Sequence, residues 1–451
     1  MAVPLWQEVE SEVTAILSEL IRIDTTNPPG NETKAAKYIA EILNKDGFQC
    51  EIFEPVPQRG SVVTRFKGSG EKPNLLFLSH LDVVAAKAAE WSVNPFGGVV
   101  KDGFVWGRGA LDMKGMTAIE IMVLKLLKRN NTHLKGDVIL AATADEEMGG
   151  LNGAMYLLQK HPEKIFAPYV LNEGGGWAIP LSNKNLYTIQ TAEKGLLWFK
   201  VKAKGTPGHG SMPDAADNAI MRMHRVIDKL CNYRGSISYL PVVKQLLEEL
   251  SKDKKLRDSM NSLLTNPQST NSVLAELSKT MPAIVDEIRP RISMTITPTI
   301  IHGGIKENVV PSECEAVFDC RILPGQTIEQ AQKLIKQILV EELDKLSVET
   351  IQAQEPSESS IETPLYQVIS NVLKDLEPNC GVAPLLMAGG TDSRFFRRLG
   401  SVCYGFHPMR SETCPRVKMT RREHGVDERI SVENLVFGTR VLYETVTRFL
   451  S

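Results

Sequence analysis

The pattern of apolar and polar positions divides the N-terminal part of the chain into alternating helical and extended stretches. Apolar residues at three- and four-residue spacing predict amphipathic helices, over residues 5–23, 32–45, 113–129 and 152–160. Short apolar runs predict β-strands, at 49–55, 61–67, 74–79 and 137–144. Because strands that alternate with helices are typical of a sheet covered on both faces, we expect an α/β domain.

The pattern changes near Thr191, where alternating apolar and polar residues suit a half-exposed antiparallel sheet. Strands and helices are predicted here in mixed order, with strands at 198–203, 291–301, 317–323 and 347–353 and helices over roughly 215–285 and 327–343. After Pro364 the helical spacing returns, at 364–376 and 432–449. We therefore predict an α+β domain, residues 193–354, inserted into an α/β domain that is split between residues 1–192 and 355–451.

Composition narrows the class of protein further. A chain of 451 residues exceeds the usual size of one domain. Its 52 basic and 54 acidic side chains nearly cancel, which argues against a nucleic-acid or membrane-surface partner. Seven scattered cysteines without a Cys-x-x-Cys pair indicate reduced thiols. Since the sequence also lacks signal-peptide features and an apolar run near the ~20 residues that cross a bilayer, we predict a cytoplasmic location.

Acidic and histidine residues are concentrated directly after the predicted strands of the first domain. His80 and Asp82 follow one apolar run, Asp145–Glu147 follow the next, and Glu173 follows a third. Asp112 lies between the first two, in a glycine-rich loop. In an open α/β sheet such strand ends meet at one edge, where ligands bind. Nitrogen and oxygen ligands without thiolate suit zinc, with cobalt or manganese as alternatives.

Each cluster alone has a simpler explanation. His80-x-Asp82 is commonly a surface pair, Asp112 a turn residue, and Asp145–Glu147 a solvated helix N-terminus. The glycines around Asp112 lack both nucleotide-binding fingerprints, so nucleotide binding has little support. Four clusters at successive strand ends favour a metal site over coincidence. In such a site Asp82 would orient the His80 imidazole, and a carboxylate kept off the metal would take a proton from water.

Three further histidines bear on this chemistry. A second imidazole ligand is expected from the C-terminal part, where His424 is preferred and His407 competes with it. In the inserted domain, His209 lies in an exposed, glycine-flanked segment. It is either an ordinary loop residue or an electrophile that stabilises an oxyanion at the metal site.

These residues resemble the zinc-dependent amidohydrolases that include aminoacylase, carboxypeptidase G, acetylornithine deacetylase and succinyl-diaminopimelate desuccinylase. The resemblance covers nearly the whole chain and rests on six ordered motifs: Ser-His80-Leu-Asp82-Val-Val, Gly-Arg-Gly-x-x-Asp112-Met-Lys-Gly, Asp-Glu146-Glu147-x-Gly, Glu173-Gly, Gly-His209-Gly-Ser-x-Pro with Asn218-Ala, and Glu-His424-Gly-Val-Asp-Glu. It implies a phosphorylase/hydrolase-like catalytic domain with a mixed sheet. The inserted domain would be a lid or dimerisation domain with a ferredoxin-like sheet.

Carried over by position, the resemblance implies two divalent metal ions that share Asp112 as a bridging ligand. His80 and Glu173 would complete one site, and Glu147 and His424 the other. Zinc is the expected metal, with cobalt or manganese as alternatives. A cis peptide bond after Asp112 is also usual in this family.

The resemblance assigns the remaining groups to catalysis and substrate binding. Glu146 would be the general base and acid acting on the water between the metals, with Asp82 behind His80. His209 would polarise the scissile carbonyl. Polar groups of the inserted domain and of a C-terminal loop would bind the substrate, namely Asn308, Arg321, Gly390 and Thr391.

The function implied is hydrolysis of an amide bond next to a free carboxylate, in a small N-acyl amino acid or short peptide. A deacylase or carboxypeptidase-like enzyme is preferred, because Glu173 resembles that branch, and a dipeptidase is the alternative. An inactive binding protein would have damaged ligands, and none of the five is missing. Extra helices near 235–288 lengthen the lid. The expected assembly is therefore either a homodimer through the lid or a monomer with an enlarged lid.

Overall fold

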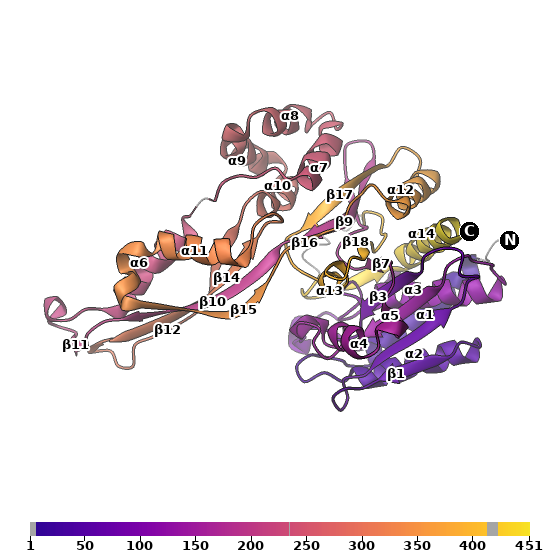
Figure 1. The fold of residues 1–451 in the computed structure, drawn as a ribbon, viewed down its shortest axis with the longest axis horizontal. Coiled ribbons are helices and arrows are strands. Elements are labelled where there is room, and N and C mark those ends of the chain that lie inside the picture. The colour runs from indigo at the N-terminus through magenta and orange to yellow at the C-terminus, as the bar shows by residue number, and fades with distance from the viewer. Residues whose placement is uncertain (1–5, 234, 413–422) are drawn as a thin grey trace. The chain divides into compact units, whose positions relative to one another are not determined.

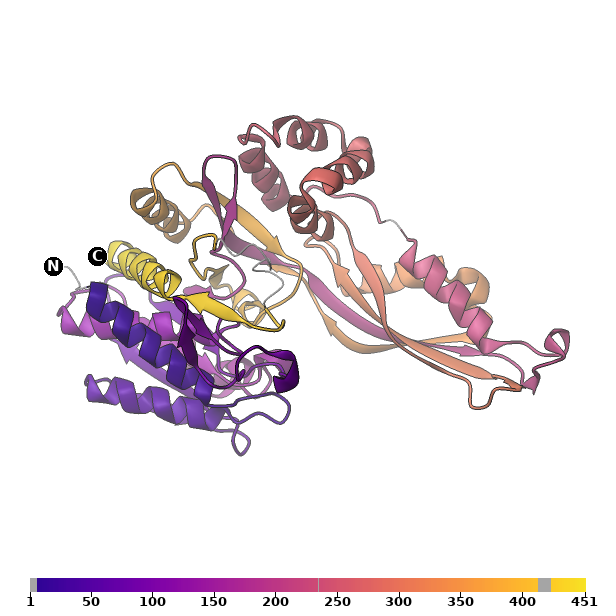
Figure 2. The same cartoon turned by 180° about the vertical axis from the view of Figure 1, so that it is seen from behind.

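The structure, a computed structural model, describes residues 6–233, 235–412 and 423–451, so Cys414 lies outside the described residues. The chain divides into two compact units, drawn in Figures 1 and 2. Unit 1 comprises Met1–Thr191, Ser359–Leu385 and Thr391–Ser451, and unit 2 comprises Ala192–Glu358 and Leu386–Gly390. Within the described ranges, no helix combines the length and the apolar character needed to cross a membrane.

A mixed β-sheet forms the centre of unit 1. Its strands are, in spatial order, β1 (Cys50–Phe53), β2 (Ser61–Phe66), β6 (Val138–Thr143), β3 (Leu75–His80), β7 (Tyr169–Asn172), β18 (Val402–Gly405) and β9 (Asn185–Glu193). The neighbours β6, β3, β7 and β18 run parallel, whereas β1, β2 and β6 pair antiparallel. Every residue of β3 and β6 is buried, as continuous apolar runs in a covered parallel sheet predict.

Helices cover both faces of this sheet (Figure 1). Leu75 and Phe77 of β3 pack on one side, whereas Leu76 and Leu78 pack on the other, because successive strand residues point to opposite faces. The first face is covered by α1 (Trp6–Arg22), α2 (Glu32–Lys45), α3 (Lys114–Arg129), α12 (Pro364–Leu376) and α14 (Val432–Leu450). The second face is covered by α4 (Ala154–Lys160), α5 (Pro162–Ile165) and α13 (Ser393–Arg397). The predicted α/β class with helices on both faces is confirmed.

Smaller strands of unit 1 were not predicted from the sequence. They are β4 (Val99–Lys101), β5 (Phe104–Trp106) and β19 (Arg429–Ser431), which form a separate sheet, and β8 (Ala178–Pro180) and β17 (Gly381–Met387), which pair with β9. Strand β18 was missed as well. These strands are short or lack a clear period of two, so their pairing is decided by neighbours that are distant in sequence.

Unit 2 contains a four-stranded antiparallel sheet in the order β12–β14–β10–β15, within the described residues. Its elements are, in chain order, β10 (Gly195–Lys204), α6 (Ala219–Cys231), β12 (Thr295–Gly303), β14 (Glu313–Ile322), α11 (Ile328–Ile338) and β15 (Leu346–Gln354). The order β-α-β-β-α-β is that of a ferredoxin-like module. Alternate residues of β14, including Phe318 and Cys320, are buried in the core with α6 and α11, while Asp319 and Arg321 face the other way. The predicted α+β insertion is confirmed.

The predicted helical region of unit 2 is confirmed, whereas one other helix prediction there was wrong in extent. The region 215–285 is a series of shorter helices, α6 followed by α7 (Pro241–Ser251), α8 (Arg257–Thr265), α9 (Thr270–Thr280) and α10 (Pro282–Ile288). Pro241 and Pro282 are the first residues of α7 and α10, a position where a missing N–H is tolerated. The helix predicted at 327–343 ends at Ile338 and continues as a 3₁₀ segment, Val340–Lys345.

Candidate metal centre

The candidate ligands of unit 1 converge because of the strand order. His80 is the last residue of β3 and lies in register with Thr143, the last residue of the neighbouring parallel strand β6. Strand β7, which ends one residue before Glu173, flanks β3 on its other side. The segments after β6, β3 and β7 therefore leave the same edge of the sheet side by side.

At this edge the five predicted ligands form two groups that share Asp112. His80, Asp112 and Glu173 form one group, and Asp112, Glu147 and His424 the other; in each group the donor atoms all lie within 4.8 Å of one another. Asp112 Oδ1 is 3.0 Å from His80 Nε2, and Asp112 Oδ2 is 2.9 Å from His424 Nε2. Since each oxygen of Asp112 faces a different histidine, this carboxylate is placed to bridge two positions.

The loop before α3 aims Asp112 at this edge. Gly107 has φ +152°, and a Cβ there would collide with Ile21 and the carbonyl oxygen of Pro95, so the loop requires glycine at this point. The peptide bond between Asp112 and Met113 is cis, as the family resemblance implied.

Glu428 ties this loop to the C-terminal segment, a role that the sequence analysis missed. The backbone N–H groups of Leu111 and Asp112 donate to Glu428 Oε1, over 2.8 and 3.1 Å. Arg108 donates to Glu428 Oε2 over 2.6 Å and to the carbonyl of Gly425 over 3.0 Å. Because Gly425 follows His424, these bonds join the two segments that supply the shared carboxylate and the second imidazole. Both Arg108 and Glu428 lie inside the quoted motifs, which was the available signal.

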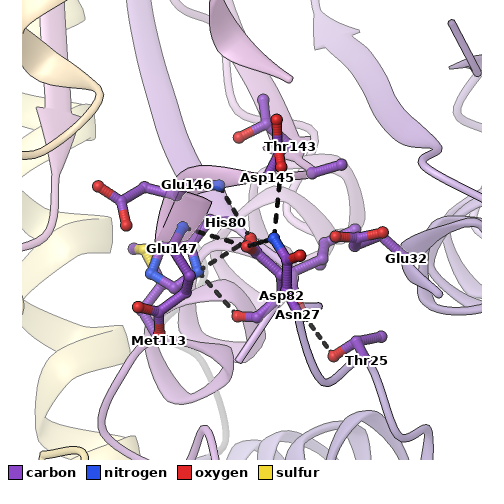
Figure 3. Close-up of polar contacts among 12 residues, drawn as sticks. Thr25, Asn27, Glu32, His80, Asp82, Met113, Thr143, Asp145, Glu146 and Glu147 are labelled. Atoms are coloured by element: carbon purple, nitrogen blue, oxygen red, sulfur yellow. Dashed lines mark hydrogen bonds and ion pairs between the residues drawn. The ribbon is translucent and has the colours of Figure 1, made fainter. Parts of the chain in front are cut away.

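Asp82 contacts both its own strand end and the acidic turn after β6 (Figure 3). The Nδ1 atom of His80 lies 2.9 Å from the Asp82 carbonyl oxygen and 3.5 Å from Asp82 Oδ1. The carboxylate accepts the backbone N–H groups of Glu146 and Glu147, each over 3.1 Å. Asp82 therefore caps the 3₁₀ turn Glu146–Met148 in the manner of an N-cap, a contact that the His-x-Asp spacing did not predict.

Crowding of charge is the main electrostatic feature of this edge. Burial, together with the nearby Glu173 carboxylate, raises the pKa of Glu146 well above its ordinary value. Burial raises the pKa of Glu173 to about 7. Hydrogen bonds with Asp112 and Glu147 raise the pKa of His424 to about 11. Since buried carboxylates this close together disfavour their charged forms unless cations compensate them, the donor set fits two divalent ions.

His407, which competed with His424 in the sequence analysis, belongs to neither group. It is buried, and burial lowers its pKa to about 4. His424 has half of its side chain exposed and reaches both Asp112 and Glu147. Of the two histidines, only His424 is placed as a ligand among the described residues.

The predicted catalytic residue His209 and the predicted substrate-binding residue Asn308 lie together in unit 2. Strand β11 (Gly208–His209) pairs with β13 (Val309–Val310), and Gly210 N–H donates to the Asn308 carbonyl over 2.9 Å. Both side chains are exposed. Because the Ser211 N–H donates to His209 Nδ1 over 3.2 Å, a neutral imidazole carries its proton on Nε2 and can donate from that atom.

Arg321 and Gly390 lie at the opposite end of the same sheet. Arg321 is paired with Leu196 of β10 and donates to both oxygens of Asp319, over 2.7 and 3.1 Å. Gln354, the other neighbour of Leu196, lies against Gly390. Thr391 belongs to unit 1, where it is fully buried.

The separation between these two sets follows from the register. The β11–β13 pair continues beyond Lys204, at the far end of β10 from Leu196. Leu196 and Lys204 are eight positions apart, which is roughly 26 Å along a strand at about 3.3 Å per residue. One copy of unit 2 therefore does not bring all the predicted substrate residues together.

An α/β unit that carries a cluster of imidazole and carboxylate groups, and whose chain is interrupted by an α+β unit, is typical of a class of metallohydrolases. The chain matches the model of peptidase family M20/M25/M40 over residues 76–448, and it belongs to that family. The predicted family is thus confirmed, and the chain is an enzyme of the M20 peptidase and aminoacylase family.

Relatives and solved structures agree with this assignment. The chain is 28% identical to the N-fatty-acyl-amino acid synthase/hydrolase PM20D1 of Bos taurus, over 85% of this chain and 75% of that protein. It is 26% identical to aminoacylase-1 of Sus scrofa, over 89% of this chain and 88% of that protein. The crystal structure of the M20 family metallo-carboxypeptidase Sso-CP2 from Sulfolobus solfataricus shares the fold, with a TM-score of 0.74 and 18% identity over 97% of this chain and 99% of that one.

Proposed function

We propose that the chain is a two-metal hydrolase that cleaves the amide bond of an N-acyl amino acid, or the last peptide bond of a short peptide, next to a free carboxylate. One observation carries the proposal. Two ligand groups share Asp112, and Glu146 lies beside them without belonging to either. Water activation requires a carboxylate shared between two metal positions and a nearby carboxylate that binds neither metal and can accept a proton.

Two divalent cations, most suitably zinc, fit the donor set. His80 and Glu173 would hold one ion and Glu147 and His424 the other, with Asp112 between them. When bound, such ions lower the pKa of water and polarise a carbonyl group. Cobalt and manganese accept the same nitrogen and oxygen donors, so they remain alternatives.

Glu146 is the proposed general base and acid. Its carboxylate is largely buried, and its pKa is raised by burial and by Glu173, which favours the protonated form that a general acid needs. It would take a proton from water and give it to the leaving amine. The Arg394 guanidinium lies 3.9 Å from Glu146 Oε1 and keeps a compensating charge beside it.

Unit 2 would supply the groups that bind the substrate. His209 can donate from Nε2 to a developing oxyanion. The side chains of Asn308 and Arg321 carry hydrogen-bond donors that could bind a carboxylate. The Arg321 guanidinium already donates to Asp319. Since His209 and Arg321 are at opposite ends of one sheet, a substrate the size of an amino acid would meet both only with two copies of the chain.

We therefore propose a homodimer through unit 2. Exposed apolar residues occur on the edge strand β12, at Ile300 and Ile301, and on α6, at Ile220 and Met221. An uncovered edge strand with apolar side chains is usually protected by a partner. The alternative is a monomer in which the helices α7–α10 replace the partner, which light scattering of the purified chain would reveal.

A hydrolysis screen tests the function. The purified chain, stripped of metal and supplied with zinc, cobalt or manganese, would be assayed on N-acyl amino acids, dipeptides and the same compounds with an amidated C-terminus. We expect metal-dependent hydrolysis that is lost when the carboxylate is blocked. Faster cleavage of dipeptides would favour the dipeptidase alternative, and tight metal binding without hydrolysis would favour a binding protein.

We also propose a cytoplasmic location. Cys50, Cys314, Cys320 and Cys380 are free thiols, the form that a reducing compartment maintains. Fractionation of cells that express the full-length protein would test it, and recovery from the secreted fraction would overturn it.

A further inference from the structure

A buried group of charges lies behind the acidic turn and is not used by the mechanism above. Asp145 directly precedes Glu146, yet its side chain turns away from both ligand groups and pairs with Arg59. Arg59 Nη2 lies 2.7 Å from Asp145 Oδ1, and the same guanidinium donates to both oxygens of Glu32, over 2.8 and 2.9 Å. The Glu32 side chain is fully buried, and that of Arg59 is 11% exposed. A guanidinium held between two buried carboxylates is tightly oriented.

The Asp145 carboxylate is held from its other side as well. Its Oδ2 accepts both the backbone N–H and the side-chain amide of Asn152, each over 2.9 Å. The amide of Asn27 donates to Asp82 Oδ2 over 2.8 Å and approaches Asp145 Oδ1 at 3.3 Å (Figure 3). Asn27 thus links Asp145 to Asp82, the residue that caps the turn.

The contacts of the Asp145 side chain fix the backbone conformation that positions Glu146 and Glu147. Asp145 has φ +75°, a left-handed conformation that a non-glycine residue adopts at a cost. The two residues that follow are Glu146 and Glu147, and their N–H groups are bound to Asp82. If the carboxylate of Asp145 were released, relaxation of this residue would redirect both side chains.

The loop that contains Pro29 and Gly30 leaves room for the Arg59 guanidinium. Gly30 has φ +84°, and a Cβ there would overlap the Arg59 guanidinium. The carbonyl of Pro29 accepts a further bond from Arg59 Nη1 over 3.3 Å. Residues 27–32 therefore wrap the guanidinium, although they lie outside the segment matched by the family model.

We propose that Arg59, oriented by Glu32 and acting through Asp145, is a positioning residue that sets the placement of Glu146 and Glu147. The inference rests on the proposed function of these two glutamates. By this proposal, residues 27–32 support the candidate centre through their contacts with Arg59 on the side of the turn away from the ligand groups. Outer contacts of this kind commonly change activity or metal affinity about 10- to 100-fold.

The test compares Arg59→Met with Arg59→Lys and with a control, Arg65→Met. Arg65 lies on β2, the strand that begins two residues after Arg59, and it pairs with Asp137 over 2.7 Å, away from the turn. For Arg59→Met we expect kcat to fall about 10- to 100-fold with little change in KM, and binding of one of two zinc ions to weaken. Arg59→Lys should recover part of kcat, because it keeps the charge but loses the fork. Arg65→Met should keep wild-type kcat and zinc binding and change thermal stability alone.

A second set of three variants separates positioning from general stability. Glu32→Gln combined with Arg59→Met removes both charges, so no lone buried carboxylate remains at position 32 if the single variant fails to fold. Asp145→Asn should lower kcat as much as Arg59→Met does. The double variant of these two should have a kcat no lower than that of the worse single variant, because both residues act through the same series of contacts. Multiplied effects would show that Arg59 does not act through Asp145.

Zinc titration by calorimetry gives a readout that does not depend on turnover. If folded Arg59→Met keeps wild-type kcat and zinc affinity, the positioning role is refuted while the proposed function stands. If the wild-type chain neither binds zinc nor hydrolyses any substrate, the proposed function fails instead.

Discussion

The two units place their candidate functional residues in opposite ways. In unit 1, residues from five distant parts of the chain meet at one sheet edge, and most are buried or half-buried. In unit 2, His209 and Asn308 are exposed at one end of a sheet, and Arg321 lies at the other end. The first set gathers within one copy of the chain, whereas members of the second lie far apart.

The difference indicates a division of labour. Candidate ligands with bonded neighbours, such as Asp112, whose backbone N–H donates to Glu428, would be preorganised before any substrate arrives. Exposed donors on a separate unit can be brought to the substrate when it binds, at the cost of ordering them. We therefore expect substitutions in unit 1 to act on kcat and metal content, and those in unit 2 to act on substrate binding and assembly.

Loss of the proposed base is the most severe test of the unit 1 side. Glu146→Gln should lower kcat by about 10³-fold or more, since the amide cannot accept the proton from water. Metal content should stay at the wild-type value, because Glu146 belongs to neither ligand group. Steady-state kinetics and elemental analysis of the same sample check both points. Activity close to wild type would remove Glu146 from its role.

The division across two copies can be tested by complementation. His209→Asn alone should lower kcat about 10²-fold, the usual cost of an oxyanion donor. Subunits of Glu146→Gln and His209→Asn, each nearly inactive, would be mixed under conditions that permit exchange. A dimer with shared sites should then recover roughly a quarter of wild-type activity, since half of the dimers are mixed and each has one intact site. No recovery despite proven exchange would favour sites formed within one copy.

The pH dependence of metal binding tests the preorganised centre. Burial by itself lowers the pKa of His80, but Glu173 and Asp112 raise it well above its ordinary value, and the pKa of His424 is about 11. The His424 imidazole is then protonated in the metal-free chain at neutral pH, so metal binding must displace at least this proton. Zinc affinity should fall as pH falls, by up to about tenfold per pH unit for each proton released. Calorimetry in buffers of different ionisation enthalpy would count the protons, and a constant affinity between pH 6 and 8 would contradict the expectation.

The smallest expected effect concerns the frame of unit 1. Glu120 is fully buried in α3, and burial raises its pKa to about 8, with the Ser79 hydroxyl opposing the shift. The folded chain therefore keeps a proton that the unfolded chain releases above about pH 4.5, and stability is lost as pH rises towards 8. Glu120→Gln cannot ionise, so its stability relative to wild type should rise by about 1 kcal/mol per pH unit over this window. Urea unfolding at pH 5 and pH 8 measures the difference, and an equal gain at both would refute it.

Several features of the fold and centre were predictable because they depend on local pattern. The helices at Glu32–Lys45 and Lys114–Arg129 follow from apolar spacing, and the buried strand at Leu75–His80 from its continuous apolar run. The interruptions of the 215–285 region at Pro241 and Pro282 could have been predicted from the prolines themselves.

Other features could not be predicted locally. Strand β18 has no marked period, and it is a strand because it lies against β7. Arg59 and Glu32 are ordinary charged residues in the sequence, and only the fold brings them behind Asp145. Asp319 accepts hydrogen bonds from Arg321, a contact that their two-residue spacing in β14 permits but does not require.

The sequence by itself determined which residues stand at strand ends, since side-chain chemistry and apolar runs are local properties of the chain. The tertiary structure alone decided how those ends lie beside each other, that Asp112 faces two histidines, and that His209 and Arg321 are far apart. Strand order and register depend on contacts between segments that are remote in sequence, so no local pattern encodes them.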